Sequence, residues 1–102
     1  MKLVHYPEKK LKKEIKEIVD KYLDLKKYKI FFFGSRVKGD NFPRADIDIG
    51  IEGPKEIPIE IMAKIEEEIS NLSTLYHIDI VDFRNVSDDF YEVAKQKVEM
   101  IK

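Results

Sequence analysis

Residues 33–48 decide the fold and read FGSRVKGDNFPRADID, a Gly-Ser pair followed after ten residues by an Asp-x-Asp pair. An uninterrupted apolar run precedes the pair at 30–33, as expected of a strand that is buried on both faces. Isoleucines at every second position predict another strand over 46–51. Because side chains two residues apart share a strand face, Asp46 and Asp48 are expected to point to the same side.

The paired acids and the Gly-Ser corner together favour a nucleoside triphosphate bound with Mg²⁺. Side chains two apart on a strand lie roughly 6.5–7 Å apart, and carboxylates so placed repel each other unless a cation or proton lies between them. Mg²⁺ prefers hard oxygen ligands, and such a pair can bridge two ions about 3.5–4 Å apart. Gly34 lets the backbone approach a ligand closely, and a helix start after Ser35 would offer N–H groups to phosphate.

The Gly-Ser pair, its ten-residue spacing and the Asp-x-Asp pair resemble the signature of the DNA-polymerase-β-like nucleotidyltransferase superfamily. The short chain and the sequence Gly-Ser-Arg-Val-Lys-Gly at 34–39 resemble the minimal nucleotidyltransferases of this superfamily, the MNT proteins often encoded beside HEPN toxins. Val37 stands where alanine is commoner and Ala45 where serine often precedes the acids, and neither difference removes a ligand. The resemblance implies a nucleotidyltransferase core with a mixed sheet and a third carboxylate on the next strand.

Two acids in the predicted strand 76–83 are candidates for that third carboxylate. Asp79 and Asp82 are three residues apart, so they cannot share a strand face. The family context of one acid among apolar residues matches 78–81, and the resemblance therefore favours Asp79. Asp82 is expected to cap nearby backbone instead, and His77 is expected to be a strand-entry residue rather than a ligand.

The resemblance also implies a role for each candidate residue. The expected nucleotide-binding residues are Gly34, Ser35, Arg36 and Lys38, and the expected metal-holding and catalytic residues are Asp46, Asp48 and Asp79. The resemblance implies that an acceptor hydroxyl attacks the α-phosphorus of ATP and releases pyrophosphate, with two Mg²⁺ ions as cofactors. From the residues alone, two alternatives stay open: Arg36 pairs with a local carboxylate, and Lys38 faces solvent.

The remaining periodicity predicts an α/β (α+β) fold in which helices pack a small mixed sheet. Helices are expected over 7–28, 58–72 and 88–101, with a short helical turn through Lys38, and strands over 29–33, 46–51 and 76–83. Ser87 is a good N-cap for the last helix. An apolar stripe is expected along that helix, formed by Phe90, Val93, Ala94, Val98 and Ile101.

Length and composition indicate one domain over residues 1–102. The 19 basic and 20 acidic residues leave a net charge of −1, which argues against direct nucleic-acid binding. The chain has no cysteine, no apolar run of membrane-spanning length and no signal-peptide core, so a cytoplasmic protein without membrane contact is expected. The 38% of charged residues lean toward a thermophilic source, with an ordinary soluble surface as the alternative.

Three functions are compatible with these features. The resemblance implies an antitoxin enzyme that transfers AMP from ATP to a tyrosine hydroxyl on a HEPN partner and so inactivates that ribonuclease. Because the chain holds little beyond the core, a second copy or another protein must complete its pocket. The alternatives are a non-catalytic module that neutralises its partner by binding it, and transfer to a small-molecule hydroxyl. The intact acids favour the enzyme, and the sequence leaves the oligomeric state open.

Overall fold

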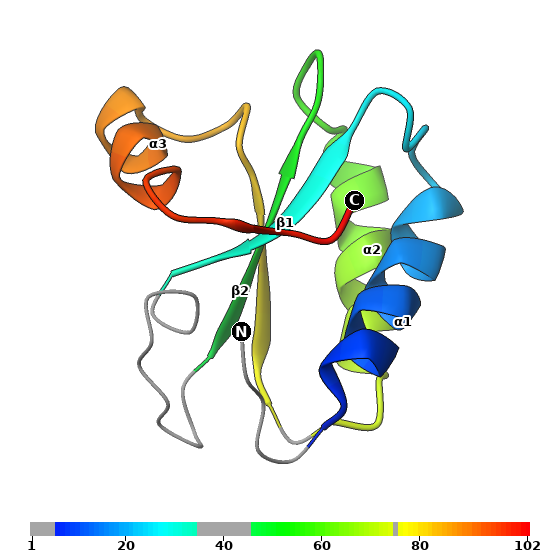
Figure 1. Ribbon diagram of the computed structural model, residues 1–102. Helices are drawn as coiled ribbons and strands as arrows, with labels where there is room; N and C mark the ends of the chain where they lie inside the picture. The colour runs from blue at the N-terminus through cyan, green and yellow to red at the C-terminus, as the bar shows by residue number, and fades with distance from the viewer. Residues whose placement is uncertain (1–5, 35–45, 75) are drawn as a thin grey trace.

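A mixed sheet with two helices on one face and a third on the other forms the molecule (Figure 1). The computed structural model describes residues 6–34, 46–74 and 76–102. In chain order the elements are α1 (Glu8–Asp20), β1 (Lys29–Phe33), β2 (Ile47–Glu52), α2 (Ile59–Ser70), β3 (Ile78–Asp82), α3 (Asp88–Ala94) and β4 (Glu99–Met100).

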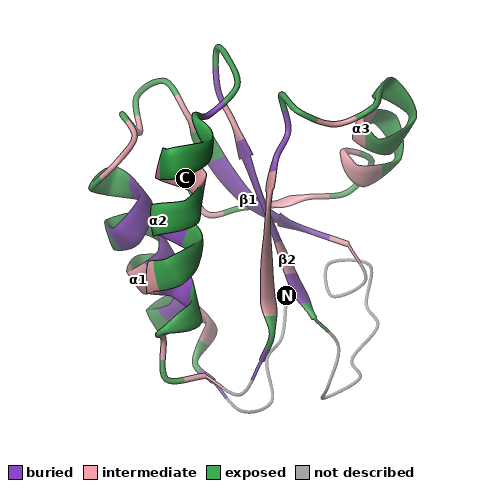
Figure 2. Ribbon diagram, turned by 180° about the vertical axis from the view of Figure 1, so that it is seen from behind, coloured by how far each residue is buried: buried purple, intermediate pink, exposed green. Residues whose placement is uncertain are grey.

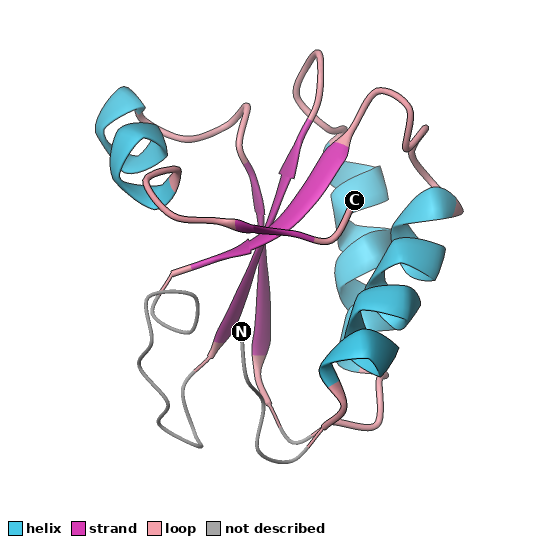
Figure 3. Cartoon of the chain, in the orientation of Figure 1, coloured by secondary structure: helices cyan, strands magenta, loops and turns pink. Residues whose placement is uncertain are grey.

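The strand order is β3-β2-β1-β4 (Figure 3). β1 is antiparallel to both β2 and β4, whereas β2 and β3 are parallel. A parallel pair needs a crossover connection, and α2 supplies it. The expected α/β fold with a small mixed sheet is therefore confirmed.

The main core lies between the sheet and the pair α1 and α2. Figure 2 shows the buried residues gathered along the two central strands and on α1. β1 is buried at four consecutive positions after its first residue, as the apolar run at 30–33 predicts. The largest fully enclosed side chains of this core are Leu11, Ile15, Ile30, Phe32, Ile47, Ile49, Ile51 and Ile65.

The opposite face of the sheet, called the open face below, carries an aromatic cluster made of Phe31, Phe33 and Phe83. Gly50 makes room for two of these rings, since a Cβ there would lie 2.4 Å from Phe31 Cε2 and 2.5 Å from Phe83 Cε1. Of the described helices, only α3 packs against this cluster, through Tyr91 and Ala94. Much of this face is therefore left without a covering helix in the described ranges.

The first helix is shorter than the predicted 7–28, because α1 ends at Asp20. The residues that follow form turns, in which the N–H groups of Tyr22 and Leu23 donate to the carbonyl of Val19. Asp24 then accepts the N–H of Lys26 at 2.9 Å. Such local side-chain bonds favour turns over helix, although the apolar spacing continues through this stretch.

The last predicted helix, 88–101, is also too long. Ser87 caps α3 as expected and accepts the N–H of Phe90 at 3.1 Å, but the helix ends at Ala94 and β4 follows. The predicted apolar stripe is only partly present, because Phe90 and Val93 are 41% and 54% exposed. Ala94 and Val98 do pack against the aromatic cluster. The segment after α3 pairs with the edge of β1 instead. This pairing satisfies backbone N–H and C=O groups of β1 that would have no partner if the segment were helical.

The other predicted elements differ only at their ends. The predicted helix 58–72 corresponds to α2, which begins directly after Pro58, and the predicted strand 76–83 is trimmed to β3. The predicted helical turn through Lys38 lies outside the described residues. In the described ranges, no helix combines the length and the apolar character needed to cross a membrane.

Candidate active site

Three aspartates meet where β2 and β3 begin. The register pairs Asp48 of β2 directly with Asp79 of β3, and with Phe33 of β1 on its other side. Register partners on neighbouring strands project from the same face, which here is the open face. Asp46 directly precedes β2. Because it is two residues before Asp48, the alternating pattern predicts that the two side chains point to the same side.

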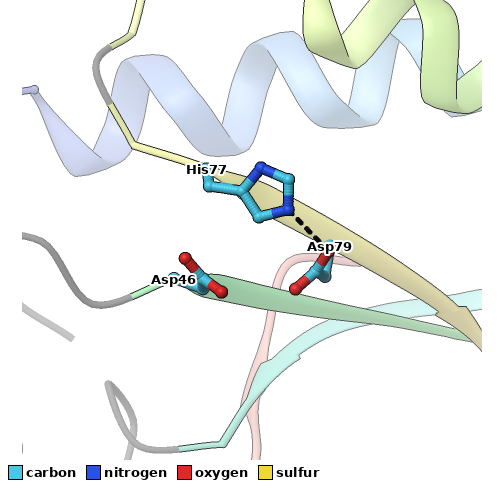
Figure 4. A group of neighbouring side chains, drawn as sticks. All are labelled: Asp46, His77 and Asp79. Atoms are coloured by element: carbon cyan, nitrogen blue, oxygen red, sulfur yellow. Dashed lines mark hydrogen bonds and ion pairs between the residues drawn. The ribbon is translucent and has the colours of Figure 1, made fainter.

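His77 also belongs to this group, although the sequence predicted a strand-entry residue rather than a ligand at this position. Its Nε2 lies 2.9 Å from Oδ1 of Asp79 (Figure 4). One ligand atom each of Asp46, His77 and Asp79 lies within 4.8 Å of the others. The side chains of His77 and Asp79 are 68% and 48% exposed. His77 lies directly before β3, so the His-x-Asp spacing suggests that both side chains point to one side, although it does not fix their contact.

The electrostatics of Asp48 reflect this crowding. Burial raises the pKa of the Asp48 carboxyl above its usual value, and the carboxylates of Asp79 and Asp46 raise the pKa further, against a lowering influence of His77. The ionised form of Asp48 is therefore disfavoured by its surroundings. A bound cation would relieve that repulsion.

Gly34 directly follows β1 and lies beside these carboxylates. Its φ of 83° belongs to the left-handed region that favours glycine. A Cβ at this position would lie 2.3 Å from Oδ2 of Asp48, so the backbone passes close to the carboxylate because there is no side chain. Three other expected nucleotide-binding residues, Ser35, Arg36 and Lys38, lie outside the described residues.

Comparison with known protein families agrees with this geometry. A family model described as polymerase beta, nucleotidyltransferase, matches residues 12–102. The chain belongs to the polymerase β nucleotidyltransferase family. It is 31% identical over 71 residues to the probable protein adenylyltransferase MntA of Haemophilus influenzae strain Rd. That alignment covers 68% of this chain, which spans 60% of the relative.

Solved structures of toxin–antitoxin complexes share the fold of this nucleotidyltransferase-family chain. One is a toxin–antitoxin crystallised with AMP-PNP, with a TM-score of 0.72, 18% identity, and coverage of 89% of this chain and 72% of that chain. Another is the complex of a tri-AMPylated Shewanella oneidensis HEPN toxin with an MNT antitoxin, with a TM-score of 0.67, 16% identity, and coverage of 90% and 69%. At these identities the likeness shows the fold.

Asp82 has a different position in this nucleotidyltransferase fold. Its side chain is buried and accepts two backbone N–H groups, from Ile57 at 2.7 Å and Arg84 at 3.0 Å. The expectation that Asp82 caps nearby backbone is confirmed. Of the two acids on β3, Asp79 is the one aligned with Asp48.

The donor atoms of the site fit a hard divalent cation. Asp46, Asp48 and Asp79 present carboxylate oxygens, the ligands that Mg²⁺ prefers. His77 supplies nitrogen, which suits transition metals better than Mg²⁺. Its contact with Asp79 is a typical arrangement in which one side chain fixes the orientation of another.

Proposed function

We propose that this chain is a Mg²⁺-dependent nucleotidyltransferase that transfers AMP from ATP to a tyrosine hydroxyl of a HEPN toxin, and that it thereby acts as an antitoxin. The register between Asp48 and Asp79, with Asp46 beside them, is the observation that carries the proposal. Membership of the nucleotidyltransferase family supports the reaction type. The similarity to a probable protein adenylyltransferase and to MNT–HEPN complexes supports the substrate and the partner.

In this proposal the three aspartates hold the metal, with two Mg²⁺ ions expected. The ions, when bound, neutralise the triphosphate and stabilise the attacking and leaving oxygens. Gly34 offers a close backbone approach for the β- and γ-phosphates, because its Cβ is absent. Ser35, Arg36 and Lys38 contact the same phosphates in this proposal.

The acceptor reacts on the side of Asp79. Its hydroxyl oxygen bonds to the α-phosphorus, the bond to the bridging oxygen breaks, and pyrophosphate leaves. The exposed carboxylate of Asp79 accepts the hydroxyl proton or orients the hydroxyl for attack. His77 acts as a positioning residue, because its bond to Oδ1 holds the Asp79 carboxylate in one orientation.

The test measures intact masses of the chain and a HEPN-type toxin before and after incubation with ATP and Mg²⁺. We expect a gain of one or more AMP units on the toxin, located on tyrosine by peptide mapping. Asp48→Asn should abolish the gain, whereas Asp20→Asn should preserve it. Asp20 is an exposed acid at the end of α1, on the other side of the sheet, so it matches the charge change.

The opposite result would favour a binding module. If Asp48→Asn and Asp79→Asn neutralise the toxin at full strength and no mass gain appears, catalysis is not the basis of neutralisation. AMP transfer to a small-molecule hydroxyl, with the toxin unmodified, would keep the reaction and reject the proposed acceptor.

A further inference from the structure

A cavity lies at the opposite end of the sheet from the three aspartates. Its volume is about 460 Å³, within the usual range for small-molecule sites. It is lined by Lys27, Lys29, Glu52, Gly53, Pro54 and Arg84. These residues come from the start of β1, the end of β2 and the segment after β3, which meet at the upper end of the sheet in Figure 1.

This cavity is separate from the candidate active site. Asp48 and Glu52 are four residues apart on β2, which corresponds to about 13 Å along a strand. α3 and the aromatic cluster occupy part of the open face between the two. A ligand in the cavity would therefore not touch the carboxylates that we assign to the metal.

The cavity carries an excess of positive charge in a chain whose net charge is −1. Lys27, Lys29 and Arg84 line it, and within the described residues none of the three has an ion-pair partner. The single lining acid is Glu52, and it is already engaged. Lys95 Nζ lies 2.7 Å from its Oε1, and the Tyr91 hydroxyl donates to its other oxygen.

Packing and one hydrogen bond fix the positions of Gly53 and Arg84 in the cavity lining. A Cβ on Gly53 would lie 2.2 Å from Cδ2 of Tyr28, so the Gly53 backbone rests against that ring. Arg84 Nε donates to the Gly53 carbonyl at 2.6 Å, which orients the guanidinium and leaves its terminal nitrogens for a ligand. An oriented guanidinium matches the geometry of phosphate oxygens.

We infer that this cavity binds a phosphate-bearing small molecule through Arg84, Lys27 and Lys29. The inference is independent of the proposed nucleotidyl transfer, because it uses none of the residues of that site. Arg84 would contact two phosphate oxygens, and the two lysines would add positive charge around them.

The test is an NMR titration of ¹⁵N-labelled protein with inorganic pyrophosphate, in EDTA and at constant ionic strength. Saturable shifts are expected at the amides of Lys29 and Gly53 and at Arg84 Nε–H, with Gly34 and Asp48 unchanged. The double variant Lys27→Gln/Lys29→Gln should weaken binding by at least about fivefold. Lys26→Gln, a neighbouring exposed lysine outside the cavity, should bind as the wild type does.

Three results would overturn the inference. Shifts that never saturate and are reproduced by NaCl would show simple charge screening. Equal weakening by Lys26→Gln would show that the lysines act through overall charge. Citrate binding as tightly as pyrophosphate would remove the assignment to phosphate. In contrast, unchanged binding in Asp48→Asn would support a site that works without the candidate active site.

Discussion

Asp48 and Asp79 face each other across the parallel pairing of β2 and β3, directly aligned in its register. Neighbouring strands are about 4.8 Å apart, so the two carboxylates are close neighbours on one face. Like charges placed opposite each other destabilise a sheet. The fold therefore maintains an unfavourable arrangement at the position where the Asp-x-Asp pattern predicts a metal site.

Asp48→Asn is expected to raise the melting temperature at neutral pH when divalent ions are absent. The raised pKa of Asp48 means that the native state binds this proton more tightly than the unfolded state does. Stability is therefore lost as the pH rises from the ordinary value of 3.8 through the raised pKa, and the variant avoids that loss. A gain of about 1 kcal/mol corresponds to roughly 4–8 °C for a domain of this size.

The same experiment repeated with Mg²⁺ supplies the contrast. Mg²⁺ should raise the melting temperature of the wild type and leave Asp48→Asn nearly unchanged, because the variant lacks a ligand. Calorimetry at pH 3 and pH 7 measures both effects. An Asn variant less stable than the wild type at pH 7 without metal would contradict the assigned repulsion.

Gly34→Ala is expected to destabilise the protein by about 1–2 kcal/mol, because alanine is strained at a positive φ. The new Cβ would also push the Asp48 carboxylate away from its place. Urea unfolding measures the stability cost. In an Asp48→Ala background the contact with the carboxylate is absent, so only the backbone cost should remain. An equal cost in both backgrounds would mean that the carboxylate moves aside freely.

The two acids of β3 should respond in opposite ways to removal. Asp82→Ala leaves the N–H groups of Ile57 and Arg84 without their acceptor, and should cost about 2 kcal/mol or more of unfolding free energy. Asp79→Ala should instead stabilise the protein by up to about 1 kcal/mol without divalent ions, because its side chain is half exposed and its removal relieves the repulsion on Asp48. Urea titrations of both variants measure the difference. Equal costs would remove the distinction between a structural acid and a site acid.

Glu52 anchors α3 to the sheet through Tyr91 and Lys95. Burial opposes its ionisation, but the hydrogen bonds from Lys95 and Tyr91 outweigh burial and hold its pKa below the usual value. This contribution is present above the ordinary pKa of 4.5 and is lost as the pH falls through the lowered pKa. Glu52→Gln should therefore cost about 1–2 kcal/mol at pH 7 and less at low pH.

Hydrogen exchange locates the effect of Glu52→Gln. Exchange should speed up mainly in α3, since the other two helices pack on the opposite face. Glu56→Gln is the matched control, because Glu56 is an exposed acid with no hydrogen bond or ion pair to another residue of the described ranges. Faster exchange spread evenly over the described sheet would show that Glu52 supports the whole fold rather than α3.

Much of the site could be predicted because it depends on local periodicity. The alternating pattern over 46–51 predicts Asp46 and Asp48 on one side, and in the structure both carboxylates lie near Asp79. The preference for Asp79 over Asp82 came from the family resemblance, in which the third acid lies among apolar residues. The structure supplies a physical basis for it, because Asp82 is used to bind backbone N–H groups.

The errors arose where tertiary contacts override local pattern. Val98 and Ile101 keep a helical spacing with Ala94, yet this segment pairs with β1 because the edge of that strand offers backbone partners. The contact between His77 and Asp79 depends on side-chain rotamers at the start of a strand, which spacing alone does not determine.

The aromatic cluster beside Asp48 also shapes the field of the site. Phe33 is its register partner, and Phe31 and Phe83 continue the hydrocarbon surface away from it. Hydrocarbon polarises little, so the field lines of the carboxylates are turned outward from this wall and concentrated toward water. The association rate of a divalent ion, or of a cationic side chain of a partner, would therefore exceed the rate expected for an uncharged surface. Added salt would lower that rate by screening the field.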